Sequence, residues 1–279
     1  MWSVLCGLAS TVFAVQDGEV ELRIVHTNDT HSCVMPVNPN SSDTALADKG
    51  GFVRRAALVR DLRAEDPDLL LFDSGDFSQG SAYYNLYKGD VEVKLMNEMR
   101  YDAATIGNHE FDFGLDNMAR IFREATFPIV CANYHFEGTV LEGLVRPYVI
   151  LERKGVKVGV FGLGTQLEGM VASENYKGVT YEDPVTAANR VADELKNKEH
   201  CDLVVCLSHL GWDIDGLDDT ELVPATRHID IVLGGHSHTY FEHPEVLKDA
   251  DGEDVYCNQM GKHGRYVGML LLEMSPTGD

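Results

Sequence analysis

The sequence predicts an α/β domain that gathers metal-binding side chains at the ends of its strands. Two observations lead to this prediction. Apolar runs of strand length alternate with segments of helical period along most of the 279 residues. Aspartate, histidine and asparagine, which are all common metal ligands, follow several of these apolar runs. A sheet would therefore bring these side chains together where its strands end.

The first half of the chain begins with a β-branched run at Val20–Thr27, which predicts a buried strand that opens into a polar loop. A helix is predicted at residues 51–65, where apolar residues recur at helical spacing between arginines. A polar, glycine-containing loop is predicted at 73–80. The same patterns predict further strands at 68–72, 102–106 and 129–132 and helices at 91–99 and 115–125.

The second half begins with strands at 146–151 and 156–162, which a tight turn at 154–155 joins as a hairpin. A proline at the start of the 184–198 segment predicts the first turn of a helix. The remaining strands are predicted at 202–207, 229–233, 255–258 and 266–272, with the last two as antiparallel strands that finish the chain. These late strands favour two sheets over one within a single compact domain at residues 20–279.

The net charge of −22 limits the partners of this chain. Such an acidic surface repels polyanions, which argues against binding to a nucleic-acid polymer. A small anionic substrate would need a local positive centre, which bound metal ions would supply. The acidity can equally serve solubility alone.

The first sixteen residues contain no charged side chain and are mostly apolar or small. This segment is too short to span a bilayer and is typical of the apolar region of a secretory signal. No lysine or arginine precedes Arg23, so the basic start of such a signal is missing. We therefore expect residues 1–19 to be a signal or an N-terminal extension, and the protein to be exported to the periplasm or the extracellular space.

Five short segments carry side chains that suit a pair of divalent cations. They lie at residues 29–31, 75–76, 107–110, 208–209 and 235–238. Together they offer carboxylate, imidazole and carboxamide groups, which are hard and borderline ligands. Each segment alone is as readily a turn or a surface group, but the five in this order favour metal binding.

The spacing within these segments predicts which side chains act together. Asp29 and His31 are two residues apart at the end of a strand, so they would share one face, as would His236 and His238. Asp76 is the candidate bridge between two cations, because a carboxylate has two oxygens and Gly75 allows close approach. Asp73 competes for that role but is better explained as a loop or capping group.

The remaining candidates are Asn108, His109 and His209. Asn108 offers a neutral oxygen, and His209 follows a buried strand. Asp112 is three residues beyond His109 and can accept a hydrogen bond from its ring, which would fix the tautomer. The other histidines that lack this context are expected to be structural or surface residues: His26, His228, His243 and His263.

These segments resemble the calcineurin-like metallophosphoesterase superfamily. The run GNHEFDFG at 107–114, together with residues 26–31 and 235–238, is similar to its 5′-nucleotidase branch. The resemblance extends from Val20 to about Leu272 and implies an αββα four-layer sandwich with two divalent metal ions.

The resemblance also implies a role for each candidate residue. One metal would take Asp29, His31, Asp76 and His238, and the other would take Asp76, Asn108, His209 and His236. The ligands contain no thiolate, which leaves Zn, Mn, Fe or Co as the metal. The implied reaction is hydrolysis of a nucleotide phosphomonoester by a metal-bound water, with His109, oriented by Asp112, as the catalytic side chain.

The 5′-nucleotidase branch usually has a second, C-terminal domain that binds the nucleotide, and no segment of this chain matches it. The sequence is then a shortened piece, or is completed by a separate C-terminal nucleotide-binding polypeptide, or acts alone on simpler phosphate esters. A cyclic-nucleotide or nucleotide-sugar phosphodiesterase is an alternative activity. A non-catalytic metal-binding subunit is an alternative of another class, against which the pair His109 and Asp112 speaks.

Overall fold

The structure is a computed structural model that describes residues 20–42, 44 and 47–274. The signal or extension expected at residues 1–19 lies outside the described residues. Two six-stranded sheets form the centre of the molecule, and a two-stranded sheet of β5 (Tyr134–His135) and β9 (Thr180–Tyr181) lies apart from them. Within the described residues, no helix is both long enough and apolar enough to cross a membrane.

The first sheet has the order β14-β1-β2-β3-β4-β6. Strands β1, β2, β3, β4 and β6 of this sheet are parallel, and only the edge strand β14 runs antiparallel, against β1. The bounds are β14 (Gly268–Met274), β1 (Val20–Thr27), β2 (Leu70–Asp73), β3 (Ala103–Ala104), β4 (Ile129–Val130) and β6 (Val145–Arg146).

The second sheet has the order β12-β13-β11-β10-β8-β7. Its four central strands are parallel, and both edge strands are antiparallel to their neighbours. The bounds are β12 (Glu245–Lys248), β13 (Asp254–Asn258), β11 (Ile231–Leu233), β10 (Leu203–His209), β8 (Val156–Gly164) and β7 (Tyr148–Arg153).

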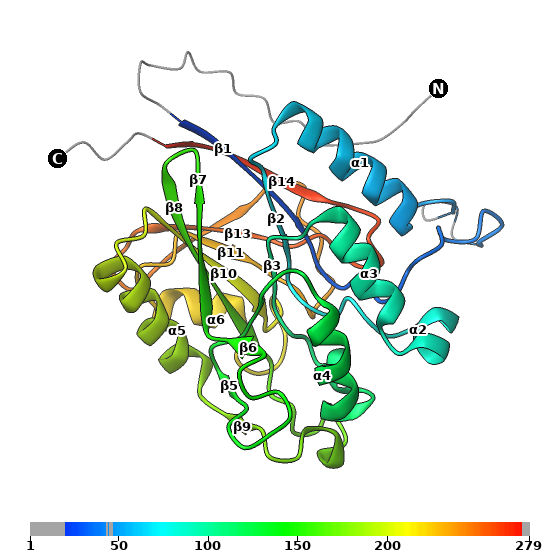
Figure 1. Cartoon of the computed structure of the whole chain (residues 1–279). Coiled ribbons are helices and arrows are strands. Elements are labelled where there is room, and N and C mark those ends of the chain that lie inside the picture. Colours follow the sequence, from blue (N-terminus) through cyan, green and yellow to red (C-terminus); the bar gives the residue numbers. More distant parts are fainter. Residues whose placement is uncertain (1–19, 43, 45–46, 275–279) are drawn as a thin grey trace.

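Helices cover the outer face of each sheet (Figure 1). The first sheet packs against α1 (Phe52–Glu65), α3 (Asp90–Met99) and α4 (Gly114–Glu124). The second sheet packs against α5 (Pro184–Asp193), which continues as a π-helical turn over Glu194–Lys198, and against the short α6 (Asp219–Leu222). The remaining helix, α2 (Ala82–Tyr87), precedes α3.

Three buried apolar clusters show that the layers are helix, sheet, sheet and helix. Alternate residues of one strand belong to different clusters, because successive side chains of a strand point to opposite faces. In β1, Ile24 packs between the two sheets, whereas Val25 packs against the helices of the first sheet. In β10, Val205 packs between the sheets and Val204 against α5 and α6. The four-layer α/β fold expected from the sequence is confirmed.

Two sequence predictions about the strands and turns are confirmed in detail. The predicted strand at Val20–Thr27 has the predicted bounds. The predicted hairpin joins β7 and β8 through Lys154 and Gly155, whose φ angles are 52° and 82°. Positive φ at both central residues is what a two-residue hairpin turn of the I′ type requires, and glycine meets that requirement without strain.

Other sequence predictions are wrong or incomplete. The two late strands each have an antiparallel neighbour, as predicted, but they lie in different sheets: β13 is antiparallel to β12 and parallel to β11 in the second sheet, and β14 is antiparallel to β1 in the first. The sequence analysis also missed α2, β5, β6, β9 and β12, which are all short. A signal for α2 was present, because the Ser81 side chain caps its first turn by accepting from the Tyr84 N–H.

Candidate metal centre

The predicted metal ligands all lie where parallel strands of the two sheets end. Asp29 and His31 follow β1, Asp76 follows β2, and Asn108 follows β3 in the first sheet. In the second sheet, His209 is the last residue of β10, and His236 and His238 follow β11. The carboxyl ends of the strands of both sheets thus bring residues from five segments into one site.

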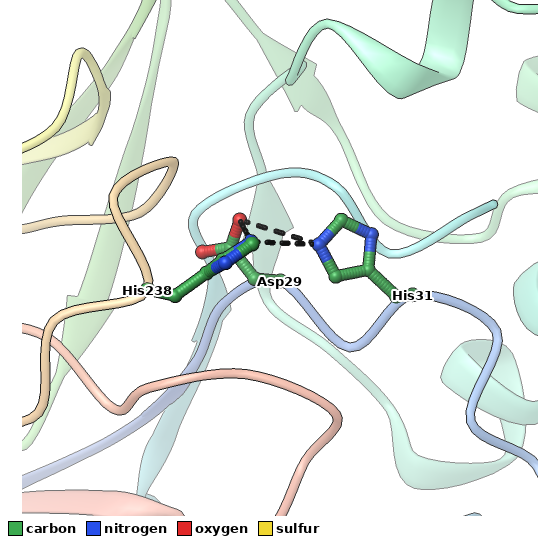
Figure 2. A group of neighbouring side chains, drawn as sticks. All are labelled: Asp29, His31 and His238. Carbon is green, nitrogen blue, oxygen red and sulfur yellow. Dashed lines mark hydrogen bonds and ion pairs between the residues drawn. The ribbon is translucent and has the colours of Figure 1, made fainter. Parts of the chain in front are cut away.

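The first ligand group consists of Asp29, His31 and His238. Figure 2 shows the three side chains pointing toward one another, with His238 approaching from a different segment than the other two. The Nε2 atoms of His31 and His238 are 2.9 Å apart, and the Asp29 Oδ1 lies 3.8 Å and 3.4 Å from them, respectively. We call these three residues the open group, because the His238 side chain keeps 32% of its surface exposed.

The second ligand group consists of Asp76, His209 and His236. The Asp76 Oδ2 lies 3.1 Å from the His209 Nε2, and both side chains are almost completely buried. The His209 Nδ1 is 2.6 Å from the Ser74 carbonyl oxygen, which can only accept, so this nitrogen carries the proton. The Nε2 atom therefore faces Asp76, and it is the ring nitrogen that would take a metal ion or, without one, a second proton. We call these three residues the buried group.

Charge in the centre follows from burial and from the neighbouring ligands. Although burial opposes it, the imidazole of His209 holds the pKa of Asp76 below its usual range, and Asp76 in turn raises the pKa of His209 to about 10. Burial next to His209 lowers the pKa of His236 to about 4. Burial also lowers the pKa of His31, and the charge of Asp76 opposes that effect. The charge of Asp76 thus acts on histidines of both ligand groups, as does that of Asp29.

Two features of the donor set fit a metal ion. The Oδ1 of Asn108 is buried and has no hydrogen-bond partner among the described residues, although an unpaired buried polar atom is costly. The two Nε2 atoms of His31 and His238 face each other at 2.9 Å, as two ligands of one cation do. The residues present therefore fit divalent cations in both groups.

Strained backbone produces this geometry. Five of the seven candidate ligands have positive φ angles: Asp29 (47°), His31 (44°), Asp76 (53°), His236 (71°) and His238 (59°). Residues other than glycine adopt this region at a cost, which persists only where the surrounding structure imposes it. The predicted reason for pairing Asp29 with His31, a shared strand face, is wrong, because β1 ends at Thr27 and the alternation rule applies only to extended backbone.

His109 and Asp112 form a pair beside the ligands. The His109 Nδ1 is 3.1 Å from the Asp112 Oδ2, and the His109 ring meets the His31 ring edge-on with centroids 5.5 Å apart. The backbone N–H of His109 donates to the Asp76 Oδ1 at 2.9 Å, which fixes the loop to the centre. Burial lowers the pKa of His109, but the hydrogen bond to Asp112 and the charge of Asp76 outweigh it and raise the pKa above its usual value.

Sequence analysis missed Glu110, which organises the buried group. Its Oε2 accepts from the backbone N–H groups of Asp76 and Gly107 at 3.0 Å and 2.7 Å. Its Oε1 accepts from the N–H and the hydroxyl of Ser78 at 3.2 Å and 2.8 Å. Burial and the neighbouring Asp76 carboxylate raise the pKa of Glu110 to about 7. One carboxylate thus ties the loop after β2 to the loop after β3.

Two amide side chains that sequence analysis also missed organise the open group. The Gln259 Oε1 accepts from the Ser237 hydroxyl at 2.9 Å and from the Thr239 N–H at 2.5 Å, and its Nε2 donates to the Gly235 carbonyl at 2.8 Å. The Asn28 Nδ2 donates to Asp29 Oδ2 at 2.6 Å. Asn28 lies within the motif at residues 26–31 but was assigned no role, and Gln259 lies in no predicted motif.

Two other residues bear on the sequence predictions. Asp73 accepts from the Thr27 hydroxyl at 2.6 Å and from the Gly75 N–H at 3.0 Å, so it is the capping group that the sequence predicted. His263 was expected to be structural or on the surface, but its ring lies 5.8 Å from the His31 ring, and its N–H donates to the Asp29 carbonyl at 2.7 Å. His263 therefore belongs to the surroundings of the open group.

Comparison with known proteins agrees with this architecture. The chain is 33% identical to human 5′-nucleotidase over 94% of this chain and 48% of that protein, and 33% identical to the snake venom 5′-nucleotidase of Crotalus adamanteus over 95% of this chain and 47% of that protein. The crystal structure of a 5′-nucleotidase precursor from Thermus thermophilus superposes with a TM-score of 0.80 at 33% identity, covering 90% of this chain and 51% of the other.

The chain spans about half the length of the curated relatives it matches. The match to a protein family covers residues 22–240, which include all seven candidate ligands together with His109 and Asp112. On the basis of this match and of its relatives, the chain belongs to the calcineurin-like phosphoesterase family.

Proposed function

We propose that this chain is a dinuclear metal-dependent phosphomonoesterase that releases phosphate from nucleotides. The observation that carries the proposal is the convergence of two ligand groups from both sheets beside the pair His109 and Asp112. A binding module would need the ligands alone. A hydrolase also needs a group that moves a proton, and His109 is placed for that role.

One cation would be held by Asp29, His31, Asp76 and His238, and the other by Asp76, Asn108, His209 and His236. The assignment of Asp76 to both is supported by its two carboxylate oxygens and by its charge, which reaches His31 of the open group as well as His209, and that of Asn108 by its unpaired buried oxygen. Bound divalent cations supply an activated water and neutralise charge on the phosphoryl oxygens. The oxygen and nitrogen ligands suit Zn, Mn, Fe or Co.

The protein side chains position the substrate and move the proton. The hydrogen bond to Asp112 raises the pKa of His109, which favours the protonated ring that would give a proton to the leaving oxygen of the ester. Asp112 accepts from Nδ1, which turns the opposite ring nitrogen of His109 away from Asp112 and leaves it free for the substrate. Nucleotides are the proposed substrates because relatives that share 33% of their residues with this chain are named 5′-nucleotidases.

The test uses the chain loaded separately with Zn²⁺, Mn²⁺ or Co²⁺ and a panel of AMP, 2′,3′-cyclic AMP and a UDP-sugar. We expect two metal ions per chain by elemental analysis and release of phosphate from AMP as the fastest reaction. Faster turnover of the cyclic nucleotide or the UDP-sugar would identify a phosphodiesterase instead. Two bound metals without turnover of any substrate would identify a metal-binding subunit, and fewer than two metals would disprove a dinuclear centre.

We further propose that the protein is exported. The uncharged, mostly apolar segment at residues 1–16 supports export, as does the occurrence of a relative in snake venom. Expression of the whole chain in a bacterial host, followed by cell fractionation, should place it outside the cytoplasm. Retention of the whole chain in the cytoplasm, at the same level as a variant without residues 1–19, would contradict export.

A further inference from the structure

One segment beside the open group has a charge opposite to that of the whole chain. Residues 255–272 contain no aspartate or glutamate, whereas the chain has 45 acidic residues against 23 basic ones. Within this segment, Lys262, His263 and Arg265 lie in the loop between β13 and β14. In a protein of net charge −22, such a loop makes the local electrostatic potential less negative than over the rest of the surface.

Hydrogen bonds attach this loop to the segment that carries Asp29 and His31. The Asn28 side chain accepts from the Met260 N–H and donates to the Gly261 carbonyl, both at 2.8 Å. The N–H of His263 donates to the Asp29 carbonyl at 2.7 Å. The basic loop is thus bound to the backbone of a candidate metal ligand, and it cannot move away from the open group without breaking these bonds.

The backbone conformation of the loop at residues 261–265 also indicates that the surrounding structure fixes its position. His263 has a φ of 63° between Gly261 at 65° and Gly264 at 59°. A side chain on Gly264 would collide with the Arg55 guanidinium, which is buried and lies over the Phe52 ring at 3.9 Å. The backbone therefore packs directly on a buried cation, an arrangement that is costly unless an anion or a polar partner compensates for it.

The cations of this loop and the neighbouring Arg55 have no ion-pair partner in the part of the chain that the structure describes. Among the described residues, no carboxylate lies within ion-pair distance of Lys262, Arg265 or Arg55. Lys262 and Arg265 are both partly exposed, and the Arg265 Nε donates to the Lys262 carbonyl at 3.0 Å, which holds the loop closed. Positive charge on this loop is thus partly open to solvent, and the loop lies beside the open group, because its His263 ring is 5.8 Å from the His31 ring.

We propose that residues 261–265 form an anion-binding loop, in which Lys262 and Arg265 attract the dianionic phosphate ester to the open group. This inference rests on the proposed function and adds to it the residues that select an anionic substrate. The loop contributes binding rather than chemistry, because its charge acts equally on the substrate before and during the reaction.

The test compares two double variants that remove the same charge. Lys262→Gln with Arg265→Gln removes the cations of the loop. The matched control is Arg227→Gln with Lys248→Gln, which removes two exposed cations that pair with Asp251 and Asp254. We expect the loop variant to raise KM for a phosphate monoester roughly tenfold with kcat nearly unchanged, and to weaken the salt dependence of kcat/KM. The control should change neither quantity.

A second readout does not depend on turnover. Inorganic phosphate should bind the metal-loaded loop variant roughly tenfold more weakly than the control variant by calorimetry, while elemental analysis still finds two metals per chain. Lys262→Arg with Arg265→Lys should restore both KM and phosphate binding, which excludes a mere folding defect. Equal KM and equal phosphate affinity in the loop and control variants would overturn the anion-binding loop.

The two proposals fail in different ways. An active wild-type protein whose loop variant matches the control variant overturns only the anion-binding loop. A wild-type protein that binds two metals and phosphate without hydrolysing any ester overturns the proposed function, and a weakened phosphate affinity of the loop variant would still support the loop.

Discussion

The open and the buried ligand group are built from the same side-chain types but are held in different ways. Each group has two buried members and one partly exposed histidine. Asp76 and His209 of the buried group are 2% and 0% exposed, and the Glu110 carboxylate holds the backbone around them. His238 of the open group is 32% exposed, and the neutral amide of Gln259 holds its loop. A buried carboxylate can be balanced by cations nearby, whereas a carboxylate at the open side would repel an anionic substrate.

The two ligand groups share one property: each takes its residues from both sheets. The open group takes Asp29 and His31 from the first sheet and His238 from the second. The buried group takes Asp76 from the first sheet and His209 and His236 from the second. A bound cation in either group would therefore connect the two sheets and stabilise the folded state.

The largest effect is expected from Asp76→Asn, because Asp76 is the proposed ligand of both cations. Activity should fall to background, and elemental analysis should find fewer than two metals per chain. The increase in melting temperature on addition of metal should also be smaller than in the wild type. The matched control is Asp73→Asn, which changes the neighbouring carboxylate of the same loop. If Asp73→Asn loses metal and Asp76→Asn does not, the bridging role belongs to Asp73.

A smaller effect is expected from His109→Asn, which removes the proposed proton donor but no proposed ligand. Turnover should fall by about 10²–10⁴-fold with two metals retained. Asp112→Asn should cause a smaller loss, since it only weakens the orientation of the ring and the raised pKa of His109. Loss of metal from His109→Asn would place this histidine among the metal ligands. It would contradict the proposal that His109 donates a proton without binding metal.

The comparison of the two groups is tested most directly by Glu110→Gln and Gln259→Leu. Glutamine at 110 turns an amide N–H₂ toward the backbone N–H donors that Glu110 accepts from, so one metal should bind about 10–100-fold more weakly. Leucine at 259 removes the contacts to Ser237 and Thr239, and it should weaken the binding of the metal in the open group to a similar extent.

Crystal structures or X-ray absorption spectra of these two variants, loaded with one equivalent of metal, identify which group keeps its ion. We expect the Glu110 variant to keep metal in the open group, and the Gln259 variant to weaken metal binding in both groups, because Gln259 holds the loop that carries His236 as well as His238. If the Glu110 variant loses the ion of the open group instead, Glu110 does not organise the buried group in particular.

The smallest effect on activity is expected from Asp219→Asn, which lies next to the buried group without belonging to it. Its carboxylate accepts from the Ser208 hydroxyl, and burial raises its pKa from 3.8 to about 7 in spite of that bond. A carboxyl group that holds its proton more tightly in the folded state destabilises that state as it ionises, so the free energy of unfolding should fall between about pH 4 and pH 7.

Asparagine keeps the acceptor for Ser208 and removes the titration. Urea denaturation of Asp219→Asn at several pH values should therefore show a smaller decrease in the free energy of unfolding over this range than the wild type shows. Asp251→Asn, which changes an exposed carboxylate, serves as the control and should leave the decrease unchanged. A decrease that is the same in all three proteins would show that Asp219 does not titrate in this range.

Local sequence signals predicted the elements that local physics specifies. The β-branched run of β1, the hairpin turn at Lys154 and Gly155, and the proline at the start of α5 each depend on a few consecutive residues. The pairing partners of β13 and β14 could not be predicted in this way. Two apolar strands near in sequence can pair with each other or with strands elsewhere in the chain.

The sequence by itself determined the α/β class and the ligand-type residues, because strand periodicity and side-chain chemistry are local properties. Only the tertiary structure revealed that Glu110, Asn28, Gln259 and His263 surround those residues. These four side chains act on backbone groups or rings that are mostly distant in the chain, and no spacing rule encodes such contacts. The strained φ angles of Asp29, His31 and Asp76 were equally hidden, since they are imposed by hydrogen bonds between loops of different strands.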